Sequence, residues 1–403
     1  MKNIYEVLKE RDLIKQITFE EEFKELSEKE KYSVYLGIDP TADSVHIGHF
    51  IPLMMMSYFQ KCGHTPVILI GGATAIIGDP SGKTDMRKML TKEEIQINIE
   101  KIVLQLKRFI SFEGENKAIL VNNADWISNL NYIDFISKYG IHFNVNRMLS
   151  AECFKQRMLN GLTFFELNYM IMQSFDFLHL FENNNCKVEI GGDDQWSNML
   201  AGVDLIRKIH KEGSFCVTCP LLLNSEGKKM GKTVSGALWL SKEKTSCYEF
   251  YQYFRNIEDR EVYDVLRMLT YLSMEEITKL SNLQGDKINE AKKIAAYEIT
   301  KIIHGEKEAD ICKKTSEELF ENNITSDNMP TITVTKDDLN ILDLLIKCNI
   351  TTSKSQGKIL VSQNAISIND IQIDDFNYEV KDTKENSFIL KKGKKIFIKV
   401  IIE

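Results

Sequence analysis

A sixteen-residue stretch, YLGIDPTADSVHIGHF at positions 35–50, constrains the fold of this chain more than any other. Residues 32–38 form a short apolar run of β-prone side chains, residues 39–41 (Asp-Pro-Thr) are typical of a turn, and a long apolar segment begins at position 50. The pattern predicts a strand, a turn and a helix start. The free backbone N–H groups at a helix start favour an anion such as phosphate.

Two histidines in this stretch, His46 and His49, are one helical turn apart and project to the same side of the helix start. Gly48 between them leaves room for a flat group close to the backbone. This arrangement suits a nucleotide. Taken alone, however, a His-x-Gly-His sequence fits an ordinary helix cap equally well, so both interpretations stay open on these residues.

The chain has 403 residues, of which 43% are hydrophobic, enough for a large core and two or three domains. No apolar run approaches the ~20 residues that span a bilayer, so we expect no membrane partner. Residues 1–16 lack both the apolar block of a signal peptide and the acid-poor composition of a transit peptide. Together with eight irregularly spaced cysteines, this predicts a cytoplasmic protein.

Cys216 and Cys219 form the only close cysteine pair, and a structural zinc site would need a second such pair. We therefore predict no metal site and interpret the pair as part of a strand that ends at Pro220. The formal net charge is −7, although residues 330–403 hold 11 lysines against 10 acidic residues. Any RNA-binding surface must therefore be a local patch.

Apolar β-branched runs at residues 65–70, 117–121 and 186–190 alternate with helical patterns, which predicts an α/β fold with a doubly wound parallel sheet and ligands at the carboxyl ends of the strands. We expect N-terminal helices over residues 1–30, this Rossmann-like α/β domain over 31–225 and a mobile basic loop over 226–245. An α-helical domain over 246–320, a linker over 321–338 and a small α+β module over 339–403 complete the expected order. Within that module, residues 391–402 are expected to form one basic strand.

Polar side chains gather where the predicted strands end. Asp79, Lys83 and Arg87 follow the second strand, and Asp194 and Gln195 follow the double glycine 191–192. The glycines let a ligand lie against the backbone, while Asp194 offers an acceptor and Gln195 an amide.

A predicted helix over residues 162–181 carries Tyr169, Gln173 and Asp176 at positions i, i+4 and i+7, which places all three on one face. A polar stripe of this kind is more often exposed to solvent than functional. The neighbouring phenylalanines and leucines favour a pocket wall.

Five separated motifs resemble, in the same order, those of bacterial-type tyrosyl-tRNA synthetases, which are class I aminoacyl-tRNA synthetases. They are YLGIDPTADSVHIGHF, GGATAIIGDPSGK, the Tyr-x3-Gln-x2-Asp helix, GGDDQWSN and the lysine-rich loop 229–233, the counterpart of the class I KMSKS loop. The C-terminal block resembles an S4-type RNA-binding module. The resemblance covers the whole chain and implies ATP-dependent activation of L-tyrosine to tyrosyl-adenylate, followed by transfer to tRNA(Tyr).

The resemblance also implies roles for individual residues. The catalytic set comprises His46, His49, Lys83, Arg87, Lys229, Lys232 and Thr233. The ATP-binding set comprises Asp39, Thr41, Gly48, Gly192, Asp194 and Lys232. The tyrosine-binding set comprises Tyr35, Asp79, Tyr169, Gln173, Asp176 and Gln195. Mg²⁺ is expected with the ATP phosphates, without a protein-built metal site, and the family implies a homodimer.

Three positions depart from the family pattern, since Leu36 replaces a frequent cysteine and Gly231 and Thr233 replace the serines of KMSKS. Leu36 removes a thiol contact to ribose. Two alternatives remain: a tryptophanyl or other HxGH-type nucleotidyltransferase, and a non-catalytic RNA-binding protein on the same scaffold. The terminal module together with Tyr35 and Asp176 argues against the first, and the intact histidines and loop lysines argue against the second.

Overall fold

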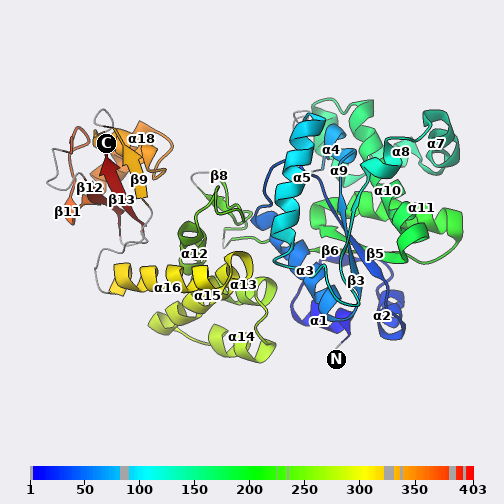
Figure 1. The fold of residues 1–403 in the computed structure, drawn as a ribbon, viewed down its shortest axis with the longest axis horizontal. Coiled ribbons are helices and arrows are strands. Elements are labelled where there is room, and N and C mark those ends of the chain that lie inside the picture. Colours follow the sequence, from blue (N-terminus) through cyan, green and yellow to red (C-terminus); the bar gives the residue numbers. More distant parts are fainter. Residues whose placement is uncertain are drawn as a thin grey trace. The chain divides into compact units, whose positions relative to one another are not determined.

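The computed structural model describes residues 3–81, 90–224, 226–233, 236–321, 331–335, 339–380, 387–393 and 396–403. These residues divide into two compact units. The first contains residues up to 223 together with 267–269, and the second contains 224–266 and 270–403. Figure 1 colours both units along the sequence.

The first unit is built on a six-stranded sheet in the order β1-β6-β5-β2-β3-β4, in which every pairing except β1 with β6 is parallel. The strands are β1 (Gln16–Ile17), β2 (Ser33–Ile38), β3 (Thr65–Ile70), β4 (Ile119–Asn122), β5 (Cys186–Gly192) and β6 (Phe215–Cys219). The doubly wound fold expected from the sequence is confirmed. Cys216 and Cys219 are buried on β6, as the strand interpretation predicted.

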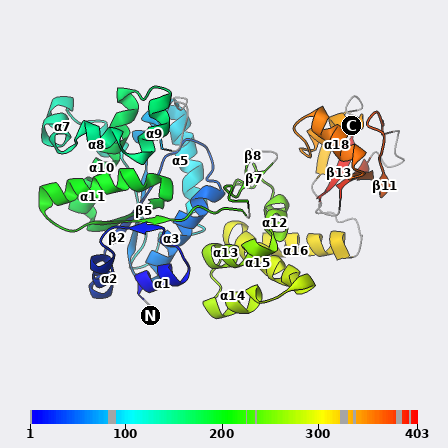
Figure 2. The same ribbon diagram turned by 180° about the vertical axis from the view of Figure 1, so that it is seen from behind.

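Helices cover both faces of this sheet. They are α1 (Ile4–Glu10), α2 (Glu20–Lys29), α3 (Phe50–Lys61), α4 (Thr74–Ile77), α5 (Lys92–Leu106), α6 (Ala124–Ile127), α7 (Tyr132–Lys138), α8 (Val145–Leu149), α9 (Glu152–Leu159), α10 (Phe164–Asn184) and α11 (Trp196–His210). Helix α3 packs on β3, β2 and β5, and α10 and α11 pack on β5, β2 and β6 from the opposite face, as Figures 1 and 2 show. The middle strands are therefore buried from both sides, which explains their nearly continuous apolar sequences.

Capping interactions define both ends of α10, the longest helix of this unit. Thr163 caps the N-terminus, and the Glu166 carboxylate accepts hydrogen bonds from the Thr163 backbone N–H and hydroxyl. Arg157 contacts the same carboxylate through Nε (2.7 Å) and holds the pKa of Glu166 below its ordinary value. Asn185 ends the helix in the left-handed conformation. A buried ion pair thus fixes where α10 starts, and with it the positions of its polar side chains.

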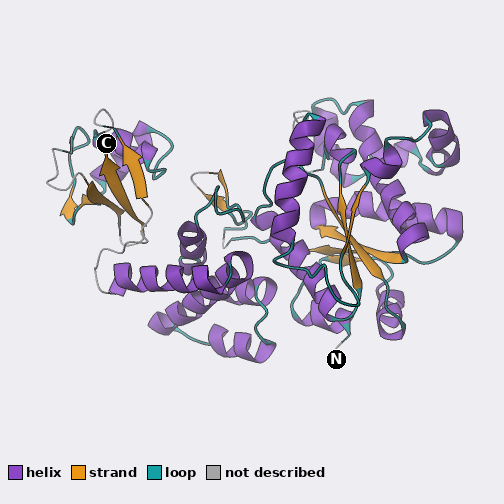
Figure 3. Cartoon of the chain, viewed as in Figure 1, coloured by secondary structure: helices purple, strands orange, loops and turns teal. Residues whose placement is uncertain are grey.

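The second unit begins with a short hairpin and continues with helices, followed by a five-stranded sheet. The first elements are β7 (Lys232–Thr233), β8 (Gly236–Ala237), α12 (Cys247–Arg255), α13 (Val262–Leu269), α14 (Met274–Ser281), α15 (Ile288–His304) and α16 (Glu306–Glu321). The C-terminal part comprises β9 (Thr331–Val334), α17 (Ile341–Lys347), α18 (Lys354–Ser362), β10 (Ile366–Ile368), β11 (Ile371–Gln372), β12 (Ser387–Lys392) and β13 (Ile396–Ile402). Its strands, coloured in Figure 3, pair in the order β11-β10-β12-β13-β9 around a hydrophobic core of their own.

Two expectations for this C-terminal part were wrong. Residues 331–334, placed in the linker, form β9, which pairs in parallel with β13 because alternate side chains can enter the core. The basic segment 391–402 is not one strand, since β12 ends at Lys392 and Gly393 turns the chain with φ +54°. Most of the expected linker, residues 322–330 and 336–338, lies outside the described residues. No described helix combines the length and apolar composition needed to cross a membrane.

Candidate functional site

The sheet of the first unit reverses its strand order between β2 and β5, its two middle strands. From β2 the chain continues outward to β3 and β4, whereas from β5 it continues to β6 on the other side. The carboxyl ends of strands at such a reversal diverge and leave a crevice for a ligand. Asp39 follows β2 directly, and residues 193–195 follow β5. The motifs that contain Asp39 and residues 193–195 therefore lie at this reversal point.

The two histidines of the motif form the cap of a short 3₁₀ helix, η1 (Ile47–His49), that leads into α3. His46 Nδ1 accepts a hydrogen bond from the Gly48 N–H (3.0 Å), and His49 Nδ1 accepts one from the His46 N–H (3.3 Å). Because both Nδ1 atoms act as acceptors, each neutral ring carries its proton on Nε2. The cap thus prepares two Nε2–H donors. A β-carbon at Gly48 would lie 2.7 Å from His46 Cε1, so glycine is needed for the position of that ring.

Asp39 joins the loop after β2 to α10. Its Oδ2 accepts a hydrogen bond from the Tyr169 hydroxyl (2.9 Å), and its Oδ1 accepts one from Thr74 Oγ1 (2.8 Å). The backbone N–H of Thr41 donates to the Asp39 carbonyl (2.8 Å) and tightens the turn. A β-carbon at Gly71 would lie 2.0 Å from Asp39 Oδ1, so only glycine fits there. Asp39, which the resemblance assigns to ATP binding, therefore orients Tyr169, which the resemblance assigns to tyrosine binding.

Asp176 is 1% exposed and is held by two hydrogen-bond donors. Its Oδ2 accepts from Asn123 Nδ2 (2.9 Å), and its Oδ1 accepts from Trp126 Nε1 (2.8 Å). Burial raises the pKa of Asp176 to about 7, and the two donors only partly oppose that rise. Each carboxylate oxygen keeps a second lone pair, so this side chain can accept a further hydrogen bond.

Tyr35 lies on β2 with its ring buried against Phe177, and burial raises the pKa of its hydroxyl well above the ordinary value. The hydroxyl therefore stays protonated and can donate one hydrogen bond. Gly37, two residues along the same strand, accommodates it, because a β-carbon there would lie 3.2 Å from the Tyr35 hydroxyl oxygen. The Tyr35 pairing partner on β5 is Glu189.

A third group of polar residues connects the segment after α4 with the start of α11. Gln195 Nε2 donates to Asp79 Oδ2 (2.7 Å), and Gln195 Oε1 accepts from Asn198 Nδ2 (3.2 Å). Asp79 Oδ1 in turn accepts from the Ser81 N–H (3.0 Å). The amide of Gln195 thus has one fixed orientation. Nearby, a β-carbon at Gly192 would lie 2.8 Å from Asp194 Oδ1, so the double glycine keeps this strand end open.

The structure brings most of the predicted site residues together in the first unit. All three residues of the polar stripe on α10 are buried, which rules out the solvent-exposed interpretation. Lys83 and Arg87 lie outside the described residues, and Lys229, Lys232 and Thr233 belong to the second unit. There, Gly231 adopts φ +82° and its N–H donates to the Tyr253 hydroxyl (2.7 Å), while Lys232 and Thr233 form β7.

Four further residues contribute to this site without having been predicted from the sequence: Thr74, Asn123, Trp126 and Glu189. Asn123 and Trp126 follow β4, so the rule that ligands gather at the carboxyl ends of strands could have identified them. Thr74 follows β3 within the motif GGATAIIGDPSGK, so the same rule could have identified it, whereas Glu189 carries no comparable signal because its relevance depends on tertiary contacts.

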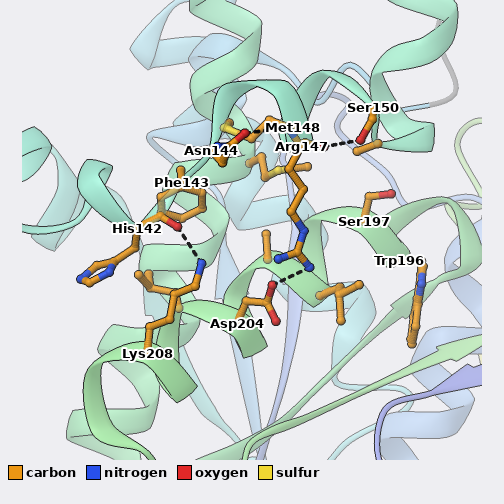
Figure 4. A pocket seen from close by; sticks show the side chains of 15 residues that line it. His142, Phe143, Asn144, Arg147, Met148, Ser150, Trp196, Ser197, Asp204 and Lys208 are labelled. Atoms are coloured by element: carbon orange, nitrogen blue, oxygen red, sulfur yellow. Dashed lines mark hydrogen bonds and ion pairs between the residues drawn. The ribbon is translucent and has the colours of Figure 1, made fainter.

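A separate cavity of about 300 Å³ lies in the first unit between α8 and α11 (Figure 4). Arg147 and Asp204 form an ion pair across it (2.8 Å), and Lys208 Nζ donates to the His142 carbonyl (2.7 Å). None of the predicted ligand-binding residues lines this cavity. It is therefore distinct from the crevice at the strand ends.

Two family models together match nearly the whole chain. Residues 27–321 match the family model of class I tRNA synthetases (W and Y), and residues 321–400 match that of the tyrosine--tRNA ligase SYY-like C-terminal domain. A tyrosine--tRNA ligase from Clostridium tetani is 54% identical over 405 residues, covering 100% of this chain and 99% of that protein. One from Clostridium perfringens is 53% identical and covers 100% of both chains.

Solved structures agree with these sequence matches. A C-terminally truncated mitochondrial tyrosyl-tRNA synthetase from Aspergillus nidulans is 29% identical, with a TM-score of 0.71, and covers 79% of this chain and 95% of that one. The Archaeoglobus fulgidus tyrosyl-tRNA synthetase complexed with L-tyrosine shares the fold, at 18% identity and a TM-score of 0.58, over 77% of this chain and 100% of that one. With two family models spanning nearly all of its length and relatives above 50% identity end to end, the chain belongs to the tyrosine--tRNA ligase family of class I tRNA synthetases.

Proposed function

We propose that this chain activates L-tyrosine with ATP to form tyrosyl-adenylate and pyrophosphate, and then transfers the tyrosyl group to the terminal ribose of tRNA(Tyr). The observation that carries the amino-acid assignment is the buried pair of polar groups, Asp176 and Tyr35, on adjacent elements at the crevice. Both would serve the phenol of tyrosine. The substrate hydroxyl donates to the Asp176 carboxylate and accepts from the Tyr35 hydroxyl.

Phenylalanine would leave both groups unsatisfied, at a cost of about 1 to 3 kcal/mol for each. Tyrosyl-tRNA synthetases are a well-known example of such discrimination, with a ratio of about 10⁵ that is reached without editing. We assign the other predicted contacts to the amino-acid backbone, with Asp79, Tyr169 and Gln173 at its ammonium and Gln195 near its carboxylate.

For the first reaction step the protein needs no general base. An amino-acid carboxylate has a pKa near ~3.5 and is already ionised at neutral pH. The rate acceleration must come from alignment of this carboxylate with the α-phosphorus and from stabilisation of the charge that develops on the phosphate oxygens. We assign that stabilisation to the Nε2–H groups of His46 and His49 and to the cations Lys83, Arg87, Lys229 and Lys232, with Thr233.

The nucleoside is proposed to bind along Asp39, Thr41, Gly48, Gly192 and Asp194. Mg²⁺ would accompany the ATP phosphates and neutralise part of their charge. Among the described residues no group of three or more His, Cys, Asp or Glu side chains could hold a metal ion. The ATP oxygens would therefore supply most of the Mg²⁺ ligands.

We propose a cytoplasmic location, where ATP and tRNA are present.

Tyrosine-dependent exchange of pyrophosphate into ATP tests the proposed function directly. Exchange with tyrosine but not with tryptophan or phenylalanine supports it. Exchange with tryptophan instead would identify a tryptophanyl enzyme, and no exchange with any amino acid would favour the non-catalytic RNA-binding alternative.

Replacement of Lys229 by alanine should slow adenylate formation about a hundredfold and leave the Kd of tyrosine unchanged. The loop charge is needed mainly in the transition state, when charge moves onto the leaving pyrophosphate. Stopped-flow measurement of a single turnover separates the two quantities. Lys228→Ala is the matched control, because the Lys228 ammonium pairs with Glu226 (2.7 Å). A raised tyrosine Kd with an unchanged rate would contradict this role.

A homodimer is the proposed assembly. Large exposed apolar side chains gather in residues 130–165 of the first unit: Leu130, Tyr132, Ile133, Ile141, Val145, Met158, Leu159, Phe164 and Phe165. Exposed apolar groups in such number within one segment are typical of a surface that another protein covers, and a two-fold axis lets such a surface cover its own copy. Sedimentation velocity should give twice the mass of one chain; a monomer at micromolar concentration would refute the dimer.

A further inference from the structure

Glu189 is a buried carboxylic acid at the centre of the sheet. It lies on β5, is 2% exposed and is paired with Tyr35 of β2 and Cys216 of β6. Its Oε1 accepts a hydrogen bond from Gln173 Nε2 (2.9 Å), while its Oε2 has no hydrogen-bond partner in the described part of the chain. A carboxylic acid buried in this way destabilises the fold unless its oxygen atoms are hydrogen-bonded or its charge is paired.

The hydrogen-bond partner of Glu189 is the amide of Gln173 on α10. The Gln173 Nε2 donates a hydrogen bond to Glu189, and the Gln173 Oε1 is buried without a hydrogen-bond partner among the described residues. An unsatisfied buried acceptor destabilises the protein, and this penalty is removed only when a hydrogen-bond donor binds to it. Gln173 lies one helical turn from Tyr169, at the crevice that we assign to the amino acid.

We propose that Glu189 is a positioning residue that fixes the Gln173 amide, so that its Oε1 faces the ammonium group of the substrate. This inference rests on the proposed function. An ammonium group only donates hydrogen bonds, so it needs the carbonyl side of the amide, and the reversed amide would present N–H groups to it. An ionised carboxylate only accepts, so it selects the N–H side. Glutamine at position 189 could pair with either side and would lose this selection.

The charge of Glu189 fits this task once the substrate is bound. Burial raises the pKa of Glu189 to about 8, with Gln173 and Tyr35 lowering it and Asp176 raising it further. A cation next to the Gln173 carbonyl favours the ionised form of Glu189. Substrate and carboxylate therefore reinforce each other through the amide between them.

Three ligands separate this role from a merely structural one: L-tyrosine, tyramine, which keeps the ammonium but lacks the carboxylate, and 3-(4-hydroxyphenyl)propionate, which lacks the ammonium. Calorimetric titration of the full chain should show that Glu189→Gln weakens tyrosine and tyramine about tenfold, the size of one hydrogen bond to a charged group, and the propionate less than about twofold. Equal weakening of all three would mean general damage to the pocket and would overturn the proposal.

The double variant decides whether Glu189 acts through Gln173. In a Gln173→Ala background, Glu189→Gln should change tyramine binding less than about twofold, because no amide remains to be oriented. A persistent tenfold loss would show direct attraction between the two charges and overturn positioning. Glu182→Gln, on the same helix as Gln173, controls for the altered net charge and should bind all three ligands like the unmodified chain. An unmodified chain that binds none of them would overturn the proposed function together with this inference.

Discussion

Asp176→Asn should lower kcat/KM for tyrosine in the pyrophosphate-exchange reaction at least about a hundredfold. The carboxylate accepts from Asn123 Nδ2 and Trp126 Nε1 on separate oxygens. Asparagine has one acceptor oxygen, so its amide N–H₂ would face one of these two donors. The substrate phenol would also lose a charged acceptor, and the two effects together amount to about 3 kcal/mol or more.

Loss of folding could produce the same drop, so thermal unfolding followed by circular dichroism must accompany the assay. Asp125→Asn is the control for charge, because Asp125 is an exposed residue between the two donors in sequence and is assigned no contact with substrate. A folded Asp176→Asn protein with unchanged kcat/KM would disprove the phenol assignment.

Tyr35→Phe provides a milder test, since we expect it to reduce the preference for tyrosine over phenylalanine without removing activation.

Removal of residues 331–403 should abolish most tRNA charging, by at least about a hundredfold, and leave tyrosine activation within about twofold. The removed segment matches the tyrosine--tRNA ligase C-terminal domain, and its core is formed only by residues between 332 and 402. It also carries lysines at positions 391, 392, 394, 395 and 399. Loss of several phosphate contacts alone weakens RNA binding by orders of magnitude.

Salt dependence gives this prediction its control. The KM of the full chain for tRNA should rise with salt concentration, because contacts with phosphate release bound cations. Residual charging by the shortened chain should depend on salt much less. If the shortened chain charged tRNA with the same KM as the full chain, the RNA-binding role of the C-terminal domain would be wrong.

Local patterns were sufficient to predict the strand ends at which the site lies. The apolar run 32–38 followed by a turn corresponds to β2 (Ser33–Ile38) and Asp39, and the i, i+4, i+7 spacing on α10 brought Tyr169, Gln173 and Asp176 to one buried face. These features depend on backbone periodicity, which neighbours in sequence determine. The assignment of individual side chains to tyrosine or ATP came from family resemblance, because periodicity carries no information about ligands.

Contacts between distant segments could not be predicted in this way. Thr74 and Asp39 are separated by 35 residues, and Asn123 and Asp176 by 53, yet each pair is hydrogen-bonded. The C-terminal hairpin is different, because its turn was visible in the sequence: Gly393 interrupts four lysines, and a glycine within a strand pattern signals a turn. The positive φ of Gly393 therefore outweighs the run of basic residues in deciding the local conformation.

The hydroxyl of Thr74 has one proton and so gives the polar network a direction. It donates to Asp39 Oδ1 and accepts from Asn123 Nδ2 (3.1 Å), while the Ala73 N–H donates to Asn123 Oδ1 (2.8 Å) and prevents the amide from reversing. Each group along the line from Tyr169 to Asp176 thus depends on its neighbour for its donor or acceptor role. A single substitution in this network leaves two donors or two acceptors facing each other. Evolution or engineering of the pocket toward another amino acid by single substitutions is therefore disfavoured. New specificity should arise from joint replacement of Asp176 and Asn123, with Thr74 retained as the fixed point.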